Sequence, residues 1–367
     1  MRLRHSLVSV DYAQMHCEEA LTRLLTADVS PRRMSRRFRI PQHWKFAGAI
    51  VYPALAIAPP TFLSDIRRSL SEAGVSSAVA RHDDAPIFDW IMSLVPLQGI
   101  SDANAASYAR SHGQARWVEI ERALLSRPSC TKLRSYWNFH ACGFKRTSWS
   151  CSESGHFLEC PLPRHPLRKG LLNQAAYSLF LFLRDVCEDD FVSWIDEQLR
   201  AADTTALPSD RAKRMRATLL DPLRQIIGIS DKLWSMILAD LLLGADAHRE
   251  RWLSTGSTFV AIDTLVHAFL HRTGILHRFE ADHSYGDQCY GEVGCAEIIE
   301  GMAKRIDARE FGIDYPSYFP RFIQHSIWRF CAQEVLNVCN GNRIDDPSRC
   351  TNWCCPMFDI CDRVSRC

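Results

Sequence analysis

The sequence lacks long apolar runs and carries almost no net charge. Its 367 residues include 44 Lys and Arg against 42 Asp and Glu, which gives a formal net charge of +2. Any surface that binds a polyanion must therefore be a local basic patch rather than a field of the whole molecule. The longest apolar stretches are too short or too interrupted to cross a bilayer, and the N-terminus lacks the apolar segment of a secretory signal. We expect an intracellular protein that is neither membrane-bound nor secreted.

Alternating strand patterns, internal repeats and low-complexity segments are also scarce, whereas helical periodicity is frequent. This balance predicts an all-α chain, and the length is sufficient for two or three domains. The stretch 31–60 has the weakest helical pattern. The clearest predicted helices are Tyr12–Leu25, Phe62–Ala73, Ile87–Val95, Trp117–Leu125, Leu171–Val186 and Phe191–Leu199.

Cysteine is abundant, with 15 residues, seven of them within the last 37 positions. Intracellular thiols stay reduced, so such clustering suggests metal ligation more than disulfides. Four thiolates on a short segment suit a [4Fe–4S] cluster or a zinc ion, and unligated thiols are the alternative. Cys354 is an alternative to Cys355, and Cys331 or Cys367 to the outer ligands. The spacing of the tail is Cys339-x10-Cys350-x4-Cys355-x5-Cys361.

A second group of Cys and His residues lies in a stretch rich in Ser, Gly and Pro. Three ligands there, with Cys142 or His165 as a fourth, could hold zinc tetrahedrally, whereas the alternative is loop thiols and solvated histidines. The three are Cys151, His156 and Cys160.

The segment 219–243 predicts two helices joined by a tight turn. Leu219, Leu223 and Ile226 share one helical face, and a second apolar face recurs every four residues after Ser230. Gly228 permits a backbone geometry that other residues resist. The free N–H groups that begin the second helix favour an anion such as a DNA phosphate.

Two motifs in this part of the chain resemble a known family. Residues 226–232, Ile-Ile-Gly-Ile-Ser-Asp-Lys, resemble the hairpin of helix-hairpin-helix DNA glycosylases related to endonuclease III. Residues 260–266 resemble the Val-Asp-Thr-His-Val element of the same enzymes, and the two motifs occur in the family's order. Ser230 replaces the second hairpin glycine, Ile227 the usual proline and Leu265 the histidine.

The resemblance implies a two-domain glycosylase fold, with a six-helix barrel followed by a helical iron–sulfur domain. We expect an N-terminal extension at 1–85 that partly packs on the C-terminal domain, the barrel at 86–244 and the catalytic and cluster domain at 245–367. It further implies a monomer, cytoplasmic (nucleoid-associated) or nuclear, that binds double-stranded DNA with a damaged or modified base. Cys339, Cys350, Cys355 and Cys361 would hold the [4Fe–4S] cluster.

The same resemblance implies roles for individual residues. Gly228, Ile229 and Ser230 would contact DNA, and Gln98 would fill the gap left by an extruded base. The carboxylate of Asp263 would stabilise the positive charge that develops on the sugar, or orient a water. Lys232 would form a Schiff base with C1′ and so add AP-lyase activity.

Several alternatives stay open at this stage. Asp263 could be a plain N-cap, and Lys232 a surface lysine paired with Asp231. Without the Schiff base the enzyme would be monofunctional, with Asp263 activating water. A non-catalytic DNA-binding protein with a structural metal site, and a zinc-dependent scaffold, are the rival functions, and the target base is not specified.

Overall fold

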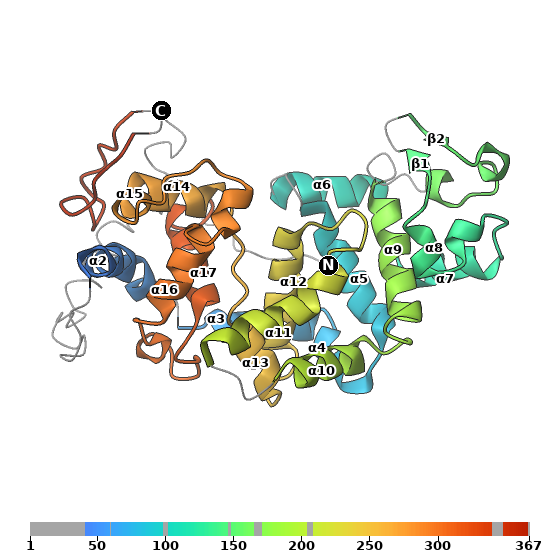
Figure 1. The fold of residues 1–367 in the computed structure, drawn as a ribbon, viewed down its shortest axis with the longest axis horizontal. Helices are drawn as coiled ribbons and strands as arrows, with labels where there is room; N and C mark the ends of the chain where they lie inside the picture. Colours follow the sequence, from blue (N-terminus) through green and yellow to red (C-terminus); the bar gives the residue numbers. More distant parts are fainter. Residues whose placement is uncertain are drawn as a thin grey trace. The chain divides into compact units, whose positions relative to one another are not determined.

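The computed structural model of this chain describes residues 41–58, 60–97, 102–145, 148–164, 171–203, 208–339 and 348–365. Over these residues it contains 16 α-helices, several short 3-10 helices and one two-stranded antiparallel sheet (Figure 1). The all-α prediction is confirmed. None of the described helices is long and apolar enough to span a membrane.

The chain divides into two compact units. One is Leu63–Phe259, and the other combines Val260–Cys367 with the chain up to Phe62. The domain boundaries predicted from the sequence, at 85/86 and 244/245, differ in position from these divisions and stay predictions. The hairpin of 219–243 belongs to the first unit, and Asp263 belongs to the second.

The unit Leu63–Phe259 is built around two helices that are apolar on nearly every side. In α9 every residue from Asn173 to Leu183 is buried, and in α12 ten of the 14 residues are buried, including Trp234. A helix that is hydrophobic all round belongs inside a core, and α5, α8 and α7 pack around α9 while α11 and α13 pack on α12. Its elements are α3 (Phe62–Glu72), α4 (Val75–Arg81), α5 (Asp84–Leu94), η2 (Val95–Leu97), α6 (Asp102–His112), α7 (Trp117–Leu125), η3 (Thr131–Leu133), α8 (Tyr136–Phe139), β1 (Phe144–Lys145), β2 (Ser150–Cys151), η4 (Ser154–His156), η5 (Leu162–Arg164), α9 (Leu171–Asp185), α10 (Phe191–Ala202), α11 (Pro208–Leu223), α12 (Asp231–Gly244) and α13 (Glu250–Gly256).

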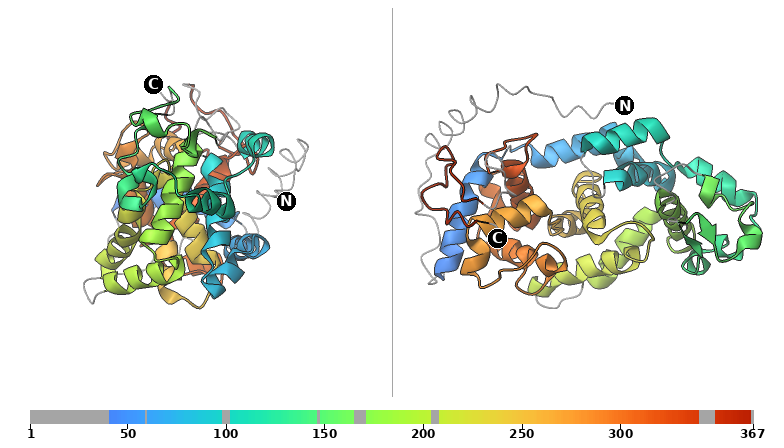
Figure 2. Two further views of the ribbon diagram at one scale, coloured as in Figure 1. Left: turned by 90° about the vertical axis from the view of Figure 1, so that its right-hand side faces the viewer. Right: turned by 90° about the horizontal axis from the view of Figure 1, so that it is seen from above.

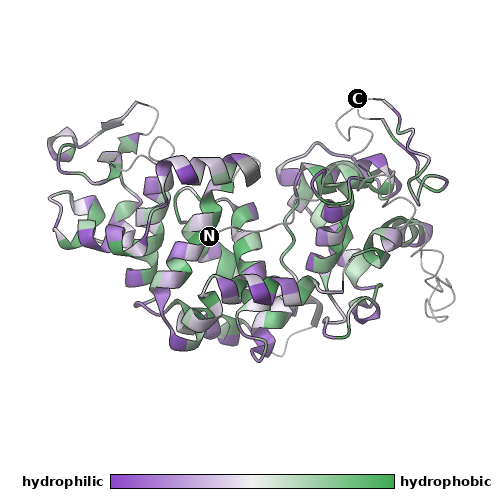
Figure 3. Ribbon diagram, turned by 180° about the vertical axis from the view of Figure 1, so that it is seen from behind, coloured by the Kyte–Doolittle hydropathy of each residue, from purple (hydrophilic) through white to green (hydrophobic). Residues whose placement is uncertain are grey.

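The other unit is centred on α17, against which α2, α14 and α16 pack. Figure 2 shows α2 beside these C-terminal helices, although more than 200 residues separate them in sequence. Figure 3 shows apolar residues gathered on the inner sides of the helices within each unit. The elements of this unit are α2 (Gln42–Ala56), α14 (Thr264–Arg272), α15 (Ile275–Arg278), η7 (Asp287–Tyr290), α16 (Cys295–Ala303), η8 (Ala308–Glu310) and α17 (Pro320–Cys331).

The stretch 31–60, which had no structure assigned to it from the sequence, contains α2, a helix of 15 residues. Its buried side chains follow helical spacing and pack on α15, α16 and α17. Burial of an apolar face stabilises a helix more than intrinsic propensity does, so Pro53 is tolerated inside it. The predicted helices from Phe62 to Leu199 are confirmed within a few residues of their ends, whereas Tyr12–Leu25 lies outside the described residues.

Candidate functional site

The predicted hairpin is a helix–turn–helix in the structure. Helix α11 ends at Leu223 and α12 begins at Asp231. Between them Gly228 has φ = 86°, a left-handed conformation that costs a residue with a Cβ about 1–2 kcal/mol. Ser230 caps α12, since its side chain accepts a hydrogen bond from the Leu233 N–H at 3.4 Å. The buried side chains of Ile226 and Ile229 anchor the turn on either side of the glycine.

Lys232 occupies the first turn of α12 and is half-buried. Its neighbour Asp231 pairs with Arg224, whose Nε lies 2.7 Å from the Asp231 carboxylate. Arg224 also reaches Asp221, at 2.8 Å. The charge of Asp231 is therefore held by an arginine across the turn, which weakens the alternative in which Lys232 is merely the partner of Asp231.

Asp263 is the N-cap of α14. Its backbone is extended, and its Oδ1 accepts a hydrogen bond from the Val266 N–H at 2.8 Å. The side chain is half-buried, and its charge acts on Tyr285 and Tyr290. Burial raises the pKa of Tyr285, and the negative charge of Asp263 raises it further. The carboxylate thus stands in a partly desolvated place, where a charge acts more strongly than it does in water.

The four predicted cluster ligands interact electrostatically in the C-terminal tail, but their sulfur atoms do not all lie within 4.8 Å of one another. Burial raises the pKa of Cys355 to about 12, and the thiols of Cys339, Cys361 and Cys350 raise it further. The Cys361 Sγ donates a hydrogen bond to the Arg272 carbonyl oxygen at 3.9 Å. A hydrogen bond with Cys331 lowers the pKa of Cys339. Burial therefore favours the neutral thiol at Cys355, and a metal that binds there must displace its proton.

The predicted zinc ligands of the 140–160 region are partly brought together. Burial raises the pKa of Cys160 to about 11, and the nearby thiols of Cys142, Cys130 and Cys151 add to the rise. His156 instead hydrogen-bonds with its Nδ1 to the Ser129 Oγ, at 2.7 Å. Cys130, which the sequence analysis did not include, therefore joins the three cysteines. A zinc ion held here stays a prediction.

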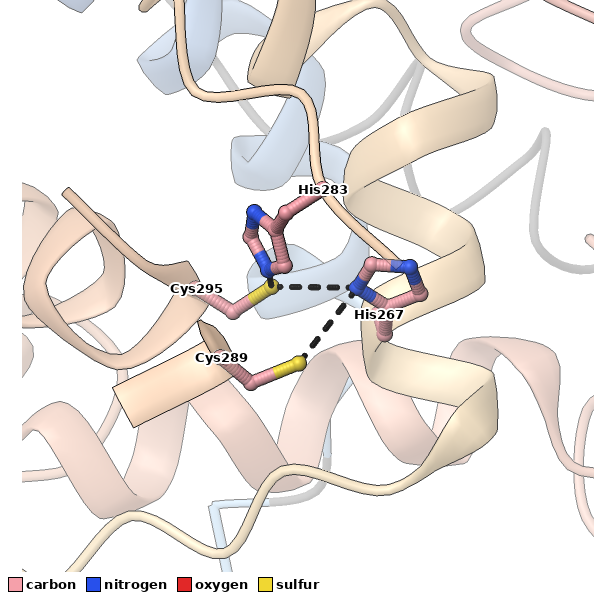
Figure 4. Close-up of side chains that lie close together, drawn as sticks. All are labelled: His267, His283, Cys289 and Cys295. Atoms are coloured by element: carbon pink, nitrogen blue, oxygen red, sulfur yellow. Dashed lines mark hydrogen bonds between the residues drawn. The ribbon is translucent and has the colours of Figure 1, made fainter. Parts of the chain in front are cut away.

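Among the described residues, the atoms that best meet the requirements of a single metal ion belong to a group that the sequence analysis missed. The ligating atoms of His267, His283, Cys289 and Cys295 all lie within 4.8 Å of one another (Figure 4). The Nδ1 of His267 is 3.4 Å from the Cys295 Sγ and 3.5 Å from the Cys289 Sγ. The Nε2 of His283 is 3.4 Å from the Cys295 Sγ. This His2Cys2 group can hold a metal ion.

The electrostatics of the His2Cys2 group favour a thiolate. A hydrogen bond from Cys295 lowers the pKa of Cys289, against the effect of its burial, and hydrogen bonds from His267 and the Gly286 backbone lower it further. The sequence signal that could have found the group is the even spacing His283-x5-Cys289-x5-Cys295. The fourth member, His267, comes from the helix that Asp263 caps.

Gln98 lies outside the described residues, as does His165. No family model, no curated protein and no solved structure matches this chain. The likeness to helix-hairpin-helix glycosylases therefore depends on the two short motifs and their order.

Proposed function

We propose that this protein is a DNA glycosylase that flips a damaged or modified base out of the duplex and cleaves its N-glycosidic bond. The observation that supports this most is the hairpin, in which Gly228 has the positive φ of a tight turn and Lys232 follows in the first turn of α12. A turn of this kind before a capped helix offers backbone N–H groups to a DNA phosphate.

The chemistry proposed for Asp263 is electrostatic. Breaking the N-glycosidic bond leaves positive charge on the deoxyribose, which a nearby carboxylate stabilises. Asp263 has the partly desolvated carboxylate that this role needs, and the Val266 N–H holds its Oδ1 in one orientation. The same carboxylate can orient a water molecule or accept a proton from an amine nucleophile.

Lys232 is the proposed amine nucleophile. Attack by its neutral amine on C1′ expels the base, and loss of the sugar ring bond gives an imine between the lysine and C1′. Elimination from that imine would cleave the strand, which is AP-lyase activity. If Lys232 only binds DNA, the enzyme is monofunctional and water is the nucleophile.

A [4Fe–4S] cluster fits the donor set of the C-terminal tail. Cys339 and Cys350 both act electrostatically on Cys355 and Cys361, where they add to the effect of burial and raise the pKa of each. We propose that these four residues hold the cluster. When bound, the cluster would stabilise the tail rather than take part in base removal.

Borohydride trapping tests the proposal. The full chain is mixed with duplexes that each carry one damaged base or an abasic site, and sodium borohydride reduces any imine to a stable adduct. We expect an adduct in wild type that Lys232→Gln loses and that the exposed-lysine control Lys304→Gln retains. Base loss without an adduct would establish the monofunctional reaction. DNA binding without either signal would instead support a non-catalytic DNA-binding protein.

A further inference from the structure

We propose that His267, His283, Cys289 and Cys295 bind one Zn2+ ion, and that this ion holds the turn that carries Asp263 in position. Zinc binding by these four residues does not depend on the proposed glycosylase function. The importance of Asp263 for catalysis does rest on that function. The experiments below separate the two.

The distances between the ligand atoms suit tetrahedral zinc. With Zn–S of about 2.3 Å and Zn–N of about 2.0–2.1 Å, the S···N edge of a tetrahedron is about 3.5 Å. The three N···S distances are 3.4, 3.5 and 3.4 Å. The side chains therefore already stand where the ligands of a zinc ion would stand, and they point toward one common centre (Figure 4).

A hydrogen bond to the backbone leaves Nε2 of His283 unprotonated and able to bind a metal. Its Nδ1 is 2.6 Å from the carbonyl oxygen of Ala281, which can only accept, so Nδ1 carries the proton. In the neutral ring Nε2 then has a free electron pair, and Nε2 is the atom that faces the Cys295 sulfur. A backbone carbonyl that fixes the tautomer of a ligating histidine is the usual outer partner at zinc sites.

Two glycines bring the cysteine ligands together. Gly286 has φ = 151°, which L residues rarely adopt, and its carbonyl oxygen accepts a hydrogen bond from the Cys289 N–H at 3.0 Å. Gly294 lies so close to the chain at Cys289 that an added Cβ would meet the Gln288 carbonyl oxygen at 2.4 Å. The residue after Gly294 is Cys295, the first residue of α16.

The site is closed, and this favours a structural ion. Cys289 and Cys295 have no exposed surface and His267 is 2 % exposed, while His283 is half-buried. Four protein ligands of the S2N2 type fill a tetrahedron and indicate zinc rather than calcium or magnesium, which take oxygen ligands. Nothing is then left open for a catalytic water.

The site is tied to Asp263 from two sides. His267 lies one turn after Asp263 on α14, and its backbone N–H donates to the Asp263 carbonyl at 3.0 Å. Tyr290, next to Cys289, accepts a hydrogen bond from the Ile262 N–H at 2.9 Å, so the residue before Asp263 is held as well. An ion that joins His267 to Cys289 therefore locks the Asp263 turn between α14 and η7.

Metal analysis of the purified full chain tests the ion itself. We expect Cys289→Ser and Cys295→Ser each to lose one zinc per chain relative to wild type, and the matched control Cys187→Ser, a buried cysteine of the other unit, to lose none. The measured quantity is the difference in zinc content between each variant and wild type. Any zinc held near Cys151 is present in both proteins and cancels. Unchanged zinc content in both ligand variants would overturn the proposal.

A conservative variant covers the case in which the serine variants do not fold. His283→Cys keeps four ligands, so it should retain the ion. After exchange into Co2+, it should show a stronger thiolate-to-cobalt charge-transfer band than wild type. Absence of tetrahedral cobalt bands in both proteins would refute the site.

Backbone amide exchange tests the positioning role without any substrate. Chelation of the zinc should speed exchange in 262–267 by at least 10-fold and leave α12 unchanged. Tyr290→Phe should keep the zinc but speed exchange at Ile262, whereas Tyr315→Phe, whose hydroxyl accepts the Phe62 N–H at 3.1 Å, should not. If the Asp263 turn exchanges equally slowly with and without zinc, the ion does not position it.

Base excision then links the ion to function. If zinc positions a catalytic Asp263, its removal should lower the single-turnover rate by about 100-fold while DNA affinity stays within a few-fold. A zinc-bound chain that excises no base from any duplex would refute the glycosylase proposal and leave the zinc site intact.

Discussion

Asp263→Asn separates a catalytic carboxylate from a plain helix cap. An Asn side chain keeps the oxygen that accepts the Val266 N–H, and Asn caps a helix about as well as Asp. The substitution removes only the favourable interaction of a negative charge with the N-terminus of α14, which is about 0.3–1 kcal/mol. We expect the melting temperature to fall by about 1–4 °C.

The loss of activity should be far larger than the loss of stability. A carboxylate that stabilises the developing positive charge or directs a proton contributes about 10²–10⁴-fold to the rate. Single-turnover base excision at saturating protein should therefore slow by that factor in Asp263→Asn, while the affinity for DNA is retained.

Asp190→Asn is the matched control. Asp190 caps α10 in the same way, with the Ser193 N–H at 2.9 Å, and it also bonds to His82. Its substitution should therefore cost at least as much stability and leave excision unchanged. If Asp263→Asn keeps full activity while Asp263→Ala is destabilised by about 0.5–2 kcal/mol, then Asp263 is only a cap.

Three further predictions concern other parts of the chain. Gly228→Ala should lower the free energy of unfolding by about 1–2 kcal/mol in urea titrations and weaken DNA binding, because φ = 86° disfavours alanine; equal stability would contradict the strained turn. Cys355→Ala should lose the iron that elemental analysis finds in wild type, whereas Cys354→Ala should keep it; the reverse would exchange the two ligands. Burial raises the pKa of Asp84 from 3.8 to about 7, so the unfolded chain binds fewer protons between these values and stability should fall as pH rises from about 4 to about 7. Asp84→Asn, which keeps an acceptor for the Phe191 N–H, should flatten this decline of up to about 4 kcal/mol in unfolding measured from pH 4 to 8; an unchanged slope would refute the assignment.

Local periodicity made most of the helices predictable. The helix Trp117–Leu125 was predicted to the residue, and the hairpin followed from two apolar faces around Gly228. Helix α2 was missed because Pro53 hid its pattern. Its buried residues Ala47, Ile50, Val51, Ala54 and Leu55 do follow helical spacing, but the surface that stabilises them comes from the far end of the chain.

The groups of possible metal ligands were harder to predict because their members converge through tertiary structure. The even spacing of His283, Cys289 and Cys295 was present in the sequence, yet the fourth ligand lies 16 residues upstream on a different helix. Likewise, Cys130 interacts with Cys142 only because both pack in or against the same hydrophobic core. A sequence window shows which residues could be ligands, and the fold decides which of them meet.

Release of free base is the most direct test of the central claim. The purified full chain is incubated with duplexes that carry oxidised, alkylated, deaminated or other modified bases, and mass spectrometry detects any base set free. We predict release of at least one modified base by wild type, with a rate that falls at least 100-fold in Asp263→Asn. No release from any duplex by folded, metal-loaded and DNA-bound protein, or equal release by Asp263→Asn, would contradict the account.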